Sequence, residues 1–265
     1  MEIVGYAASL FIGISLGLIG GGGSILTVPV MVYLFGLQPL LATSYSLFVV
    51  GSTSLVGAFN NFRRGLVNTR AALLFGVSSI ATVFLTRKFI VPSIPKNIAQ
   101  IGGTQITESL LTMVLFAILM LVASIGMIRN KDKQQTSTEM DNRFRFSKLF
   151  MYGISIGLVT GLLGAGGGFL LIPALVLLLK LPMKQAIGTS LMIIALNSLI
   201  GFTGDIGHFD IDWIFLLKIT LIAVVGIFIG GALGKRLQGE KLKKGFGWFV
   251  LVMGIYIILK ETVFN

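Results

Sequence analysis

The residues best able to do chemistry are two glycine clusters inside apolar sequence. The first lies in GLIGGGGSILTVPV at 17–30 and the second in GAGGG at 164–168. Each interior glycine costs a helix about 1 kcal/mol relative to alanine, so each cluster should end a helix. A helix that begins after such a break exposes unpaired N–H groups at the positive end of its dipole, and such groups bind anions. We therefore expect a backbone anion site formed by Gly20, Gly21, Gly22, Gly23, Ser24, Gly164, Gly166, Gly167 and Gly168.

Hydroxyl and amide side chains follow each cluster. Ser44 and Ser46 lie near the start of one apolar segment, and Thr189 and Ser190 lie near the start of another. They fit two roles, either helix caps or donors to a ligand. Asn197 lies deeper in its segment, where it serves either the site or an interhelical hydrogen bond. We include all five in the predicted substrate site.

The missing residue types exclude several classes of chemistry. The chain has no cysteine and one histidine, which argues against disulfides, thiolate metal sites and a histidine relay. No pairing of Ser with His, or of two carboxylates, falls within the apolar segments, and no GK[ST] follows the first glycine cluster. We expect no catalytic residue, no metal and no cofactor, so the chain should not be an enzyme.

The composition places the chain in a membrane. Of its 265 residues, 55% are apolar and 12% are charged, and its mean hydropathy is +0.94. A soluble domain carries about 25% charged residues, so most of this surface cannot face water. The net charge of +11 lies almost wholly in loops. It therefore indicates membrane topology and contact with the lipid bilayer, not a nucleic-acid partner.

Ten apolar segments are expected to be helices, and two of them are short. The short ones, 24–36 and 168–180, each follow a glycine cluster. Within a bilayer, non-helical backbone survives only inside protein or along a water-filled cavity. Each short segment should therefore form a bent hairpin with the segment before it, with its tip inside the protein. The full set is 3–19, 24–36, 43–60, 71–91, 108–128, 149–163, 168–180, 186–203, 213–234 and 246–260.

The sequence repeats at an offset of 144 residues. Glycine, proline and serine recur at matched positions, and such matches are less common by chance than leucine on leucine. Short interrupted segments at matched places in two halves indicate a transporter site at the interface of the halves. The matched pairs include Gly20 with Gly164, Pro29 with Pro173, Ser46 with Ser190, and Gly57 with Gly201. We assign 1–129 to a first transmembrane repeat, 130–146 to a cytoplasmic linker and 147–265 to a second repeat.

Five segments in each half mean that the second half enters the membrane in the opposite orientation. Basic residues favour the cytoplasm, which places the linker and the loop at 235–244 inside and both termini outside. One loop disagrees, because Arg87, Lys88 and Lys96 are then external. The predicted fold is an all-α polytopic membrane protein with two inverted-topology repeats, each a broken-helix hairpin plus three transmembrane helices.

These features together resemble the sulfite exporter TauE/SafE family of membrane permeases. The resemblance is carried by GLIGGGGSILTVPV and GLLGAGGGFLLIPAL, by ATSYSL and AIGTSL at equal distances after them, and by GHFDIDW near the C-terminus. It implies outward transport of a sulfur oxyanion or organosulfonate across the inner membrane. It covers nearly the whole chain and leaves the substrate open.

The predicted function is export of a small sulfur-containing anion, sulfite or an organosulfonate, through a site at the repeat interface. The expected location is the bacterial inner (cytoplasmic) membrane, with multiple passes. Two alternatives stay open: a transporter of another small anion or of a cation-coupled solute, and a non-transporting membrane assembly protein. The expected partners are a small anionic substrate and lipid, and a homodimer stays open.

Overall fold

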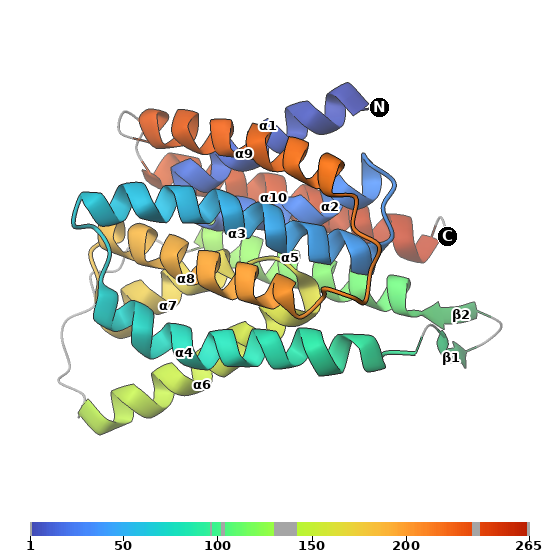
Figure 1. The fold of residues 1–265 in the computed structure, drawn as a ribbon, viewed down its shortest axis with the longest axis horizontal. Coiled ribbons are helices and arrows are strands. Elements are labelled where there is room, and N and C mark those ends of the chain that lie inside the picture. The colour runs from blue at the N-terminus through green and yellow to red at the C-terminus, as the bar shows by residue number, and fades with distance from the viewer. Residues whose placement is uncertain (1, 96, 102–103, 130–141, 235–238, 264–265) are drawn as a thin grey trace.

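The computed structural model describes residues 2–95, 97–101, 104–129, 142–234 and 239–263 (Figure 1). These residues are mostly helical. The α-helices are α1 (Glu2–Ile19), α2 (Thr27–Tyr33), α3 (Pro39–Arg63), α4 (Thr69–Leu85), α5 (Glu108–Arg129), α6 (Asn142–Leu163), α7 (Gly168–Leu179), α8 (Met183–Thr203), α9 (Trp213–Leu233) and α10 (Gly239–Val263). Shorter elements are the 3-10 helix η1 (Gly22–Leu26), the π-helical turn η2 (Thr86–Ile90), the 3-10 turn η3 (Val91–Ser93), and the strands β1 (Asn97–Ile101) and β2 (Thr104–Thr107).

The helices have the length and composition of membrane spans. Five of them are long and apolar enough to cross a bilayer among the described residues: α3, α4 with its continuation to Ser93, α5, α8 and α9. Large apolar side chains also cover the outside of the bundle, as with Ile3, Leu73 and Ile214, which are at least 66% exposed. Water-soluble monomers rarely expose large apolar surfaces. The protein is therefore a multi-pass membrane protein, as the composition predicts.

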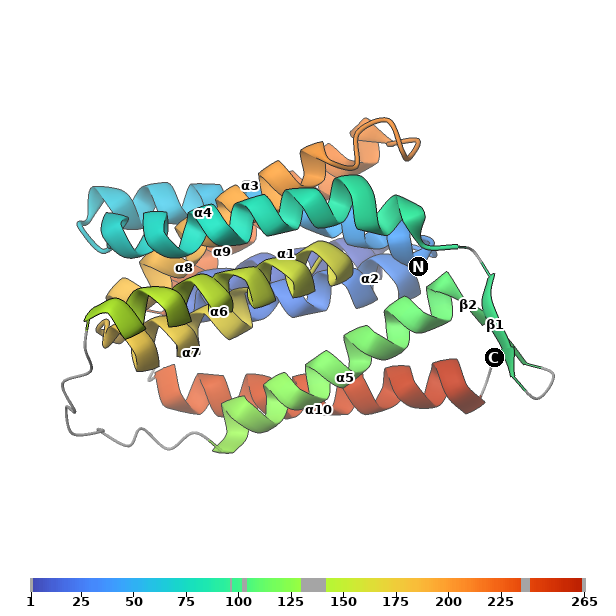
Figure 2. The ribbon, with the colours of Figure 1, turned by 90° about the horizontal axis from the view of Figure 1, so that it is seen from below.

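The long helices run along one axis between two ends of the bundle (Figures 1 and 2). At one end α1 begins, α10 ends and α8 connects to α9; we call this the terminal end. At the other end α3 connects to α4, α5 ends and α6 begins; we call this the linker end. The predicted linker lies largely outside the described residues, and its last part, 142–146, begins α6.

Two helical hairpins enter the bundle and return to the end at which they started. The first is α1–η1–α2, which begins and finishes at the terminal end, where the rings of Tyr6 and Phe35 meet edge to face at 5.8 Å. The second is α6–α7, which begins and finishes at the linker end (Figure 2). Both bend at a glycine cluster, as predicted, because glycine ends the helix there.

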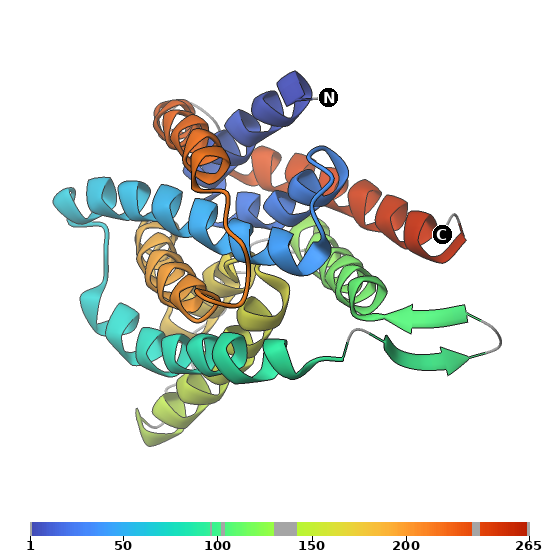
Figure 3. The same cartoon turned by 45° about the vertical axis from the view of Figure 1, so that its right-hand side comes forward.

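The two central helices are α3 and α8, which pack along each other. A Cβ built at Gly51 of α3 would lie 2.9 Å from Cγ of Leu199 in α8, so glycine permits this close approach. Around them, α1 packs on α9 and α4 packs on α6, while α5 and α10 form a pair at one side (Figures 2 and 3). Gly226 and Gly230 of α9 permit the α1–α9 contact, because a Cβ built at either position would lie against the backbone of α1.

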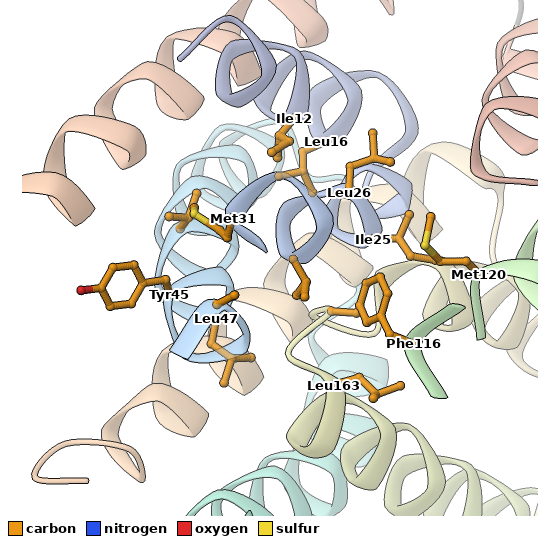
Figure 4. Packing of buried hydrophobic residues seen from close by; sticks show 14 of the residues in the cluster. Ile12, Leu16, Ile25, Leu26, Met31, Tyr45, Leu47, Phe116, Met120 and Leu163 are labelled. Atoms are coloured by element: carbon orange, nitrogen blue, oxygen red, sulfur yellow. The ribbon is translucent and has the colours of Figure 1, made fainter. Parts of the chain in front are cut away.

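The main apolar core surrounds the tip of the first hairpin. Ile12 and Leu16 of α1, Ile25 of η1 and Leu47 of α3 are buried there (Figure 4). Phe116 of α5 closes the same cluster from the side of the α5–α10 pair. A smaller core joins α4 and α8 to the second hairpin. Apolar side chains of the two clusters thus lie beside the glycine breaks, as with Ile194 beside Gly21 and Val50 beside Gly166.

Contacts between the halves recur at the 144-residue offset. A Cβ built at Gly57 would meet Ile227 and Leu191, and one built at Gly201 would meet Val83 and Leu47. At the 144-residue offset, Gly57 corresponds to Gly201, Ile227 to Val83 and Leu191 to Leu47. The repeated sequence pattern therefore corresponds to repeated packing.

One element was not predicted. The polar segment between α4 and α5 contains an antiparallel hairpin, in which Gln100 of β1 pairs with Gln105 of β2. This hairpin lies beyond the helical bundle at the terminal end (Figure 3). The all-α prediction therefore holds for the spanning part and is wrong for this connection.

Candidate functional site

The two glycine breaks meet inside the bundle. A Cβ built at Gly168, the first residue of α7, would lie 2.6 Å from Cα of Gly21 and 2.7 Å from its carbonyl oxygen. A Cβ built at Gly21 would lie 2.8 Å from Cα of Gly168. Residues 20–24 and 164–168 are all buried. The structure thus brings together the backbone of the two predicted site segments, which are far apart in sequence.

Glycine is required at these breaks by conformation as well as by space. Gly20, Gly21, Gly164, Gly166 and Gly167 all have positive φ, between 66° and 137°. Side chains with a Cβ rarely adopt such backbone angles. The breaks are therefore fixed turns that only glycine can form, and they turn each chain segment back into the bundle.

The breaks present backbone N–H donors. In the described part of the chain, no backbone carbonyl accepts a hydrogen bond from the amides of Gly21, Ala165, Gly166 or Gly167. The amide of Ser24 donates to the Gly21 carbonyl at 3.3 Å, a long hydrogen bond. Buried N–H groups normally have a partner, so these amides favour an acceptor such as an anion or water.

The carbonyls of the breaks are satisfied by serine hydroxyls. Ser46 of α3 donates to the Gly164 carbonyl at 2.7 Å, and Ser190 of α8 donates to the Gly20 carbonyl at 2.7 Å. The two bonds are exchanged counterparts at the 144-residue offset. Ser24 donates to the Gly21 carbonyl at 2.7 Å. Three predicted site serines therefore lie at the breaks, where they hold the carbonyls and leave the N–H groups as the free donors; their contact with a ligand stays a prediction.

The other predicted site side chains, at Ser44, Thr189 and Asn197, have contacts away from the breaks. Thr189 accepts a hydrogen bond from the amide of Asn68, at the start of α4, at 2.9 Å. Asn197 donates to the hydroxyl of Ser79 in α4 at 2.6 Å, which is the interhelical alternative. Its Oδ1 has no hydrogen-bond partner in the described residues. Ser44 lies beside Asp205 at the terminal end.

Further buried hydroxyls line the central helices. Thr53 and Ser54 of α3, and Ser198 of α8, have buried side-chain oxygens without a partner among the described residues. Thr53 and Ser54 are the 144-residue counterparts of Asn197 and Ser198. The polar interior is therefore shared by both halves at matched depths.

A buried ion pair was missed by the sequence analysis. Arg87, predicted to lie in an external loop, is 0% exposed within η2, and its Nη1 donates to Oδ2 of Asp205 at 3.1 Å. Asp205 is 1% exposed, just beyond the end of α8. The prediction of an external loop charge was wrong because α4 continues as η2 past Arg87. The predicted apolar segment 71–91 already contains Arg87, and this position within a helical segment was the sequence signal for its burial.

Burial and neighbouring groups have opposite effects on the pKa of Asp205. Burial raises the pKa of the Asp205 carboxyl, while Arg87, Ser44 and His208 act in the other direction. Breaking such a pair by removing one partner leaves an uncompensated buried charge. Arg87 and Asp205 thus join the ends of α4 and α8 and depend on each other.

Nothing among the described residues forms a metal site. No group of three or more His, Cys, Asp or Glu side chains is placed there so as to hold a metal ion. The buried polar groups described at the breaks and at the ion pair are backbone N–H groups, hydroxyls, the Arg87 guanidinium and the Asp205 carboxyl group.

The chain is similar to proteins described as membrane transporters. The family described as sulfite exporter TauE/SafE matches residues 6–257. A probable membrane transporter protein of Xylella fastidiosa (strain 9a5c) is 28% identical over 98% of this chain and 95% of its own length. The probable membrane transporter protein YdhB of Bacillus subtilis is 23% identical over 93% and 96%, and MJ0441 of Methanocaldococcus jannaschii, a probable membrane transporter protein, is 25% identical over 97% and 92%. No solved structure matches the chain significantly.

Proposed function

Because the chain belongs to the sulfite exporter TauE/SafE family of membrane transporters, we propose that it exports a small sulfur-containing anion, sulfite or an organosulfonate. The anion would bind where the glycine breaks of the two halves meet. The proposed membrane is the cytoplasmic membrane of a bacterium. The relatives' names support transport and name no substrate.

One observation carries this proposal. Among the described residues, the buried amides of Gly21, Ala165, Gly166 and Gly167 have no backbone acceptor, while serine hydroxyls already satisfy the neighbouring carbonyls. A group of N–H donors without competing acceptors favours an anion over a cation. Coordination of Na⁺ would instead need free carbonyls at the breaks. The arrangement therefore supports an oxyanion as the substrate.

The proposal includes two inverted repeats. In its support, α1 begins at the terminal end and α6 begins at the linker end (Figure 1). The linker end also carries Arg63 at the end of α3 and Arg129 at the end of α5. Basic residues favour the cytoplasmic side, so the linker end would face the cytoplasm. Inverted repeats around a central site permit access to that site from either side.

The membrane potential would supply the driving force. One negative charge moving outward gains about 2.3 kcal/mol per 100 mV when the cytoplasm is negative. That energy favours export about fiftyfold, because each 1.4 kcal/mol is a factor of ten. No further coupling ion is needed for net outward movement of a charged anion.

Ligand binding gives the first test. Purified protein in detergent is heated with sulfite, sulfate, thiosulfate, sulfoacetate, taurine, lactate or chloride. A ligand at 100 times its dissociation constant adds about 2.7 kcal/mol, which raises the melting temperature. We expect sulfite or a sulfonate to do so. The shift should be lost when Gly166, where an added Cβ would lie 2.8 Å from Cγ1 of Val50, is replaced by a bulky residue. It should be kept in Gly126→Ala, where the added methyl meets open space.

Transport gives the second test. Proteoliposomes are loaded with the anion that binds in the first test, and its efflux is measured with and without an imposed membrane potential. Efflux that ignores the potential would contradict electrogenic export. Binding of none of the seven compounds would instead favour a cation-coupled solute or a non-transporting assembly protein.

A further inference from the structure

Only one of the three guanidinium nitrogens of Arg87 has a hydrogen-bond partner among the described residues. Its Nη1 is bound to Asp205 at 3.1 Å, while Nε and Nη2 have no hydrogen-bond partner in the described residues. Nε and Nη2 form one edge of the planar group and carry two parallel N–H donors, which match two oxygens of a carboxylate, sulfonate or similar oxyanion. The side chain is 0% exposed, so bulk water does not satisfy this edge. Ionisable side chains within membrane helices normally pair with one another or with backbone carbonyls.

We propose that the Nε and Nη2 edge of Arg87 is a second oxyanion-binding site, at the terminal end of the transport path. This inference rests on the proposed function. It adds to that function a side chain that contacts the anion at a point on the path other than the glycine breaks. Asp205 holds the other edge of the guanidinium, fixes its orientation and offsets its charge. The anion is therefore held by two directed hydrogen bonds without the full attraction of an unpaired cation, which permits release.

The surroundings of Arg87 connect it to the second hairpin. Thr86, its neighbour in η2, contacts Gly161 near the end of α6, since a Cβ built at Gly161 would lie 2.7 Å from the Thr86 Cβ. Gly164, at the tip of the same hairpin, packs against Thr43 of α3. A Cβ built at Gly164 would lie 2.5 Å from the Thr43 carbonyl oxygen. Arg87 thus follows a residue that contacts α6, and α6 leads to the break where the amides of Ala165, Gly166 and Gly167 have no backbone acceptor among the described residues.

The charge is present at only one of two matched places. The 144-residue counterparts of Arg87 and Asp205 are Gly231 and Asn61. Asn61 donates to the Gly57 carbonyl of its own helix at 2.8 Å, and a Cβ at Gly231 would meet nothing within 4 Å. A purely structural tie between helix ends would be expected at both places, whereas a binding group for one side of the membrane is needed only once.

Equilibrium titration tests the proposal. Sodium sulfite is titrated calorimetrically into purified wild-type protein, Asp205→Asn, the double variant Arg87→Gln/Asp205→Asn, and Lys88→Gln. Lys88 is the matched control, because it is the adjacent basic residue of η2 and its side chain is exposed. The double variant keeps a neutral, hydrogen-bonding pair, so that it folds without an uncompensated charge.

We expect two sulfite ions for each wild-type chain and one for the double variant. Asp205→Asn should keep both sites and bind the second sulfite at least as tightly, because the competing carboxylate is gone. Lys88→Gln should match wild type. Arg87→Lys should keep a positive charge without the parallel donors and weaken the second site at least tenfold.

Two results would overturn the inference. If the double variant binds as many sulfite ions as wild type with the same dissociation constants, Arg87 is a structural residue, and the transport proposal is untouched. If wild type binds no sulfite, thiosulfate or sulfonate, the proposed function itself fails, and the second site fails with it.

Discussion

The contact between the two breaks makes a quantitative prediction for Gly21→Ala. Gly21 has φ of 137°, and a Cβ there would lie 2.8 Å from Cα and 3.1 Å from the carbonyl carbon of Gly168. The unfavourable backbone angle costs about 1–3 kcal/mol. Overpacking against a backbone that cannot rotate away costs about 1–3 kcal/mol more. We therefore expect a loss of about 2–6 kcal/mol in the free energy of unfolding, from the sum of these two terms.

Two glycine variants separate these terms. Gly36→Ala has φ of 71° and open space around the added methyl group, so it should show the conformational cost alone, about 1–2 kcal/mol. Gly126→Ala lies within α5 with open space and no positive φ, so it should be neutral or stabilising by up to about 1 kcal/mol.

The assay is thermal unfolding in one detergent for all three variants. A change of 1 kcal/mol shifts the melting temperature by about 2–4 °C in chains of this size. The expected order is Gly126→Ala, then Gly36→Ala, then Gly21→Ala as the least stable. If Gly21→Ala melts no lower than Gly36→Ala, the breaks do not touch as described, and a site built from both would lose its support.

Other predictions concern matched pairs. Ser46→Ala and Ser190→Ala should each cost about 1–3 kcal/mol, because each leaves a buried glycine carbonyl unpaired, and thermal unfolding should show equal losses. A much larger effect of one than of the other would contradict their equivalence. Arg87→Ala alone should cost about 3–5 kcal/mol, whereas Arg87→Met with Asp205→Leu should melt at or above wild type. If Arg87→Met with Asp205→Leu melts as low as Arg87→Ala, the ion pair stabilises the fold by more than the compensation of two buried charges.

The hairpins could be predicted because their cause is local. A run of four glycines ends a helix wherever it lies, and Pro29 and Pro173 recur at the same offset as the clusters. The length of each short segment then requires a return to the starting end. Their meeting at Gly21 and Gly168 needed the structure, because the contact joins residues from different halves.

The roles of the serines could be predicted only in part. Their position near helix starts indicated caps or ligand donors, and the structure adds a third role, since they donate to glycine carbonyls of the opposite half. Sequence alone gives no partner for a hydroxyl 118 or 170 residues away. The β1–β2 hairpin was missed for a similar reason, because its polar residues read as a loop between two apolar segments.

The departure from the repeat is as informative as the repeat. Matched glycines and serines give the two halves equivalent breaks, and equivalent breaks alone would treat the two faces of the membrane alike. In the proposed export the membrane potential sets the net direction, while the affinity for the anion at each end depends on the residues there. Arg87 and Asp205 occupy positions whose counterparts are Gly231 and Asn61, and the buried charge pair therefore stands at one end. The second anion contact proposed at Arg87 would then arise where the sequence repeat is broken, while the proposed site at the breaks would arise where the repeat is kept.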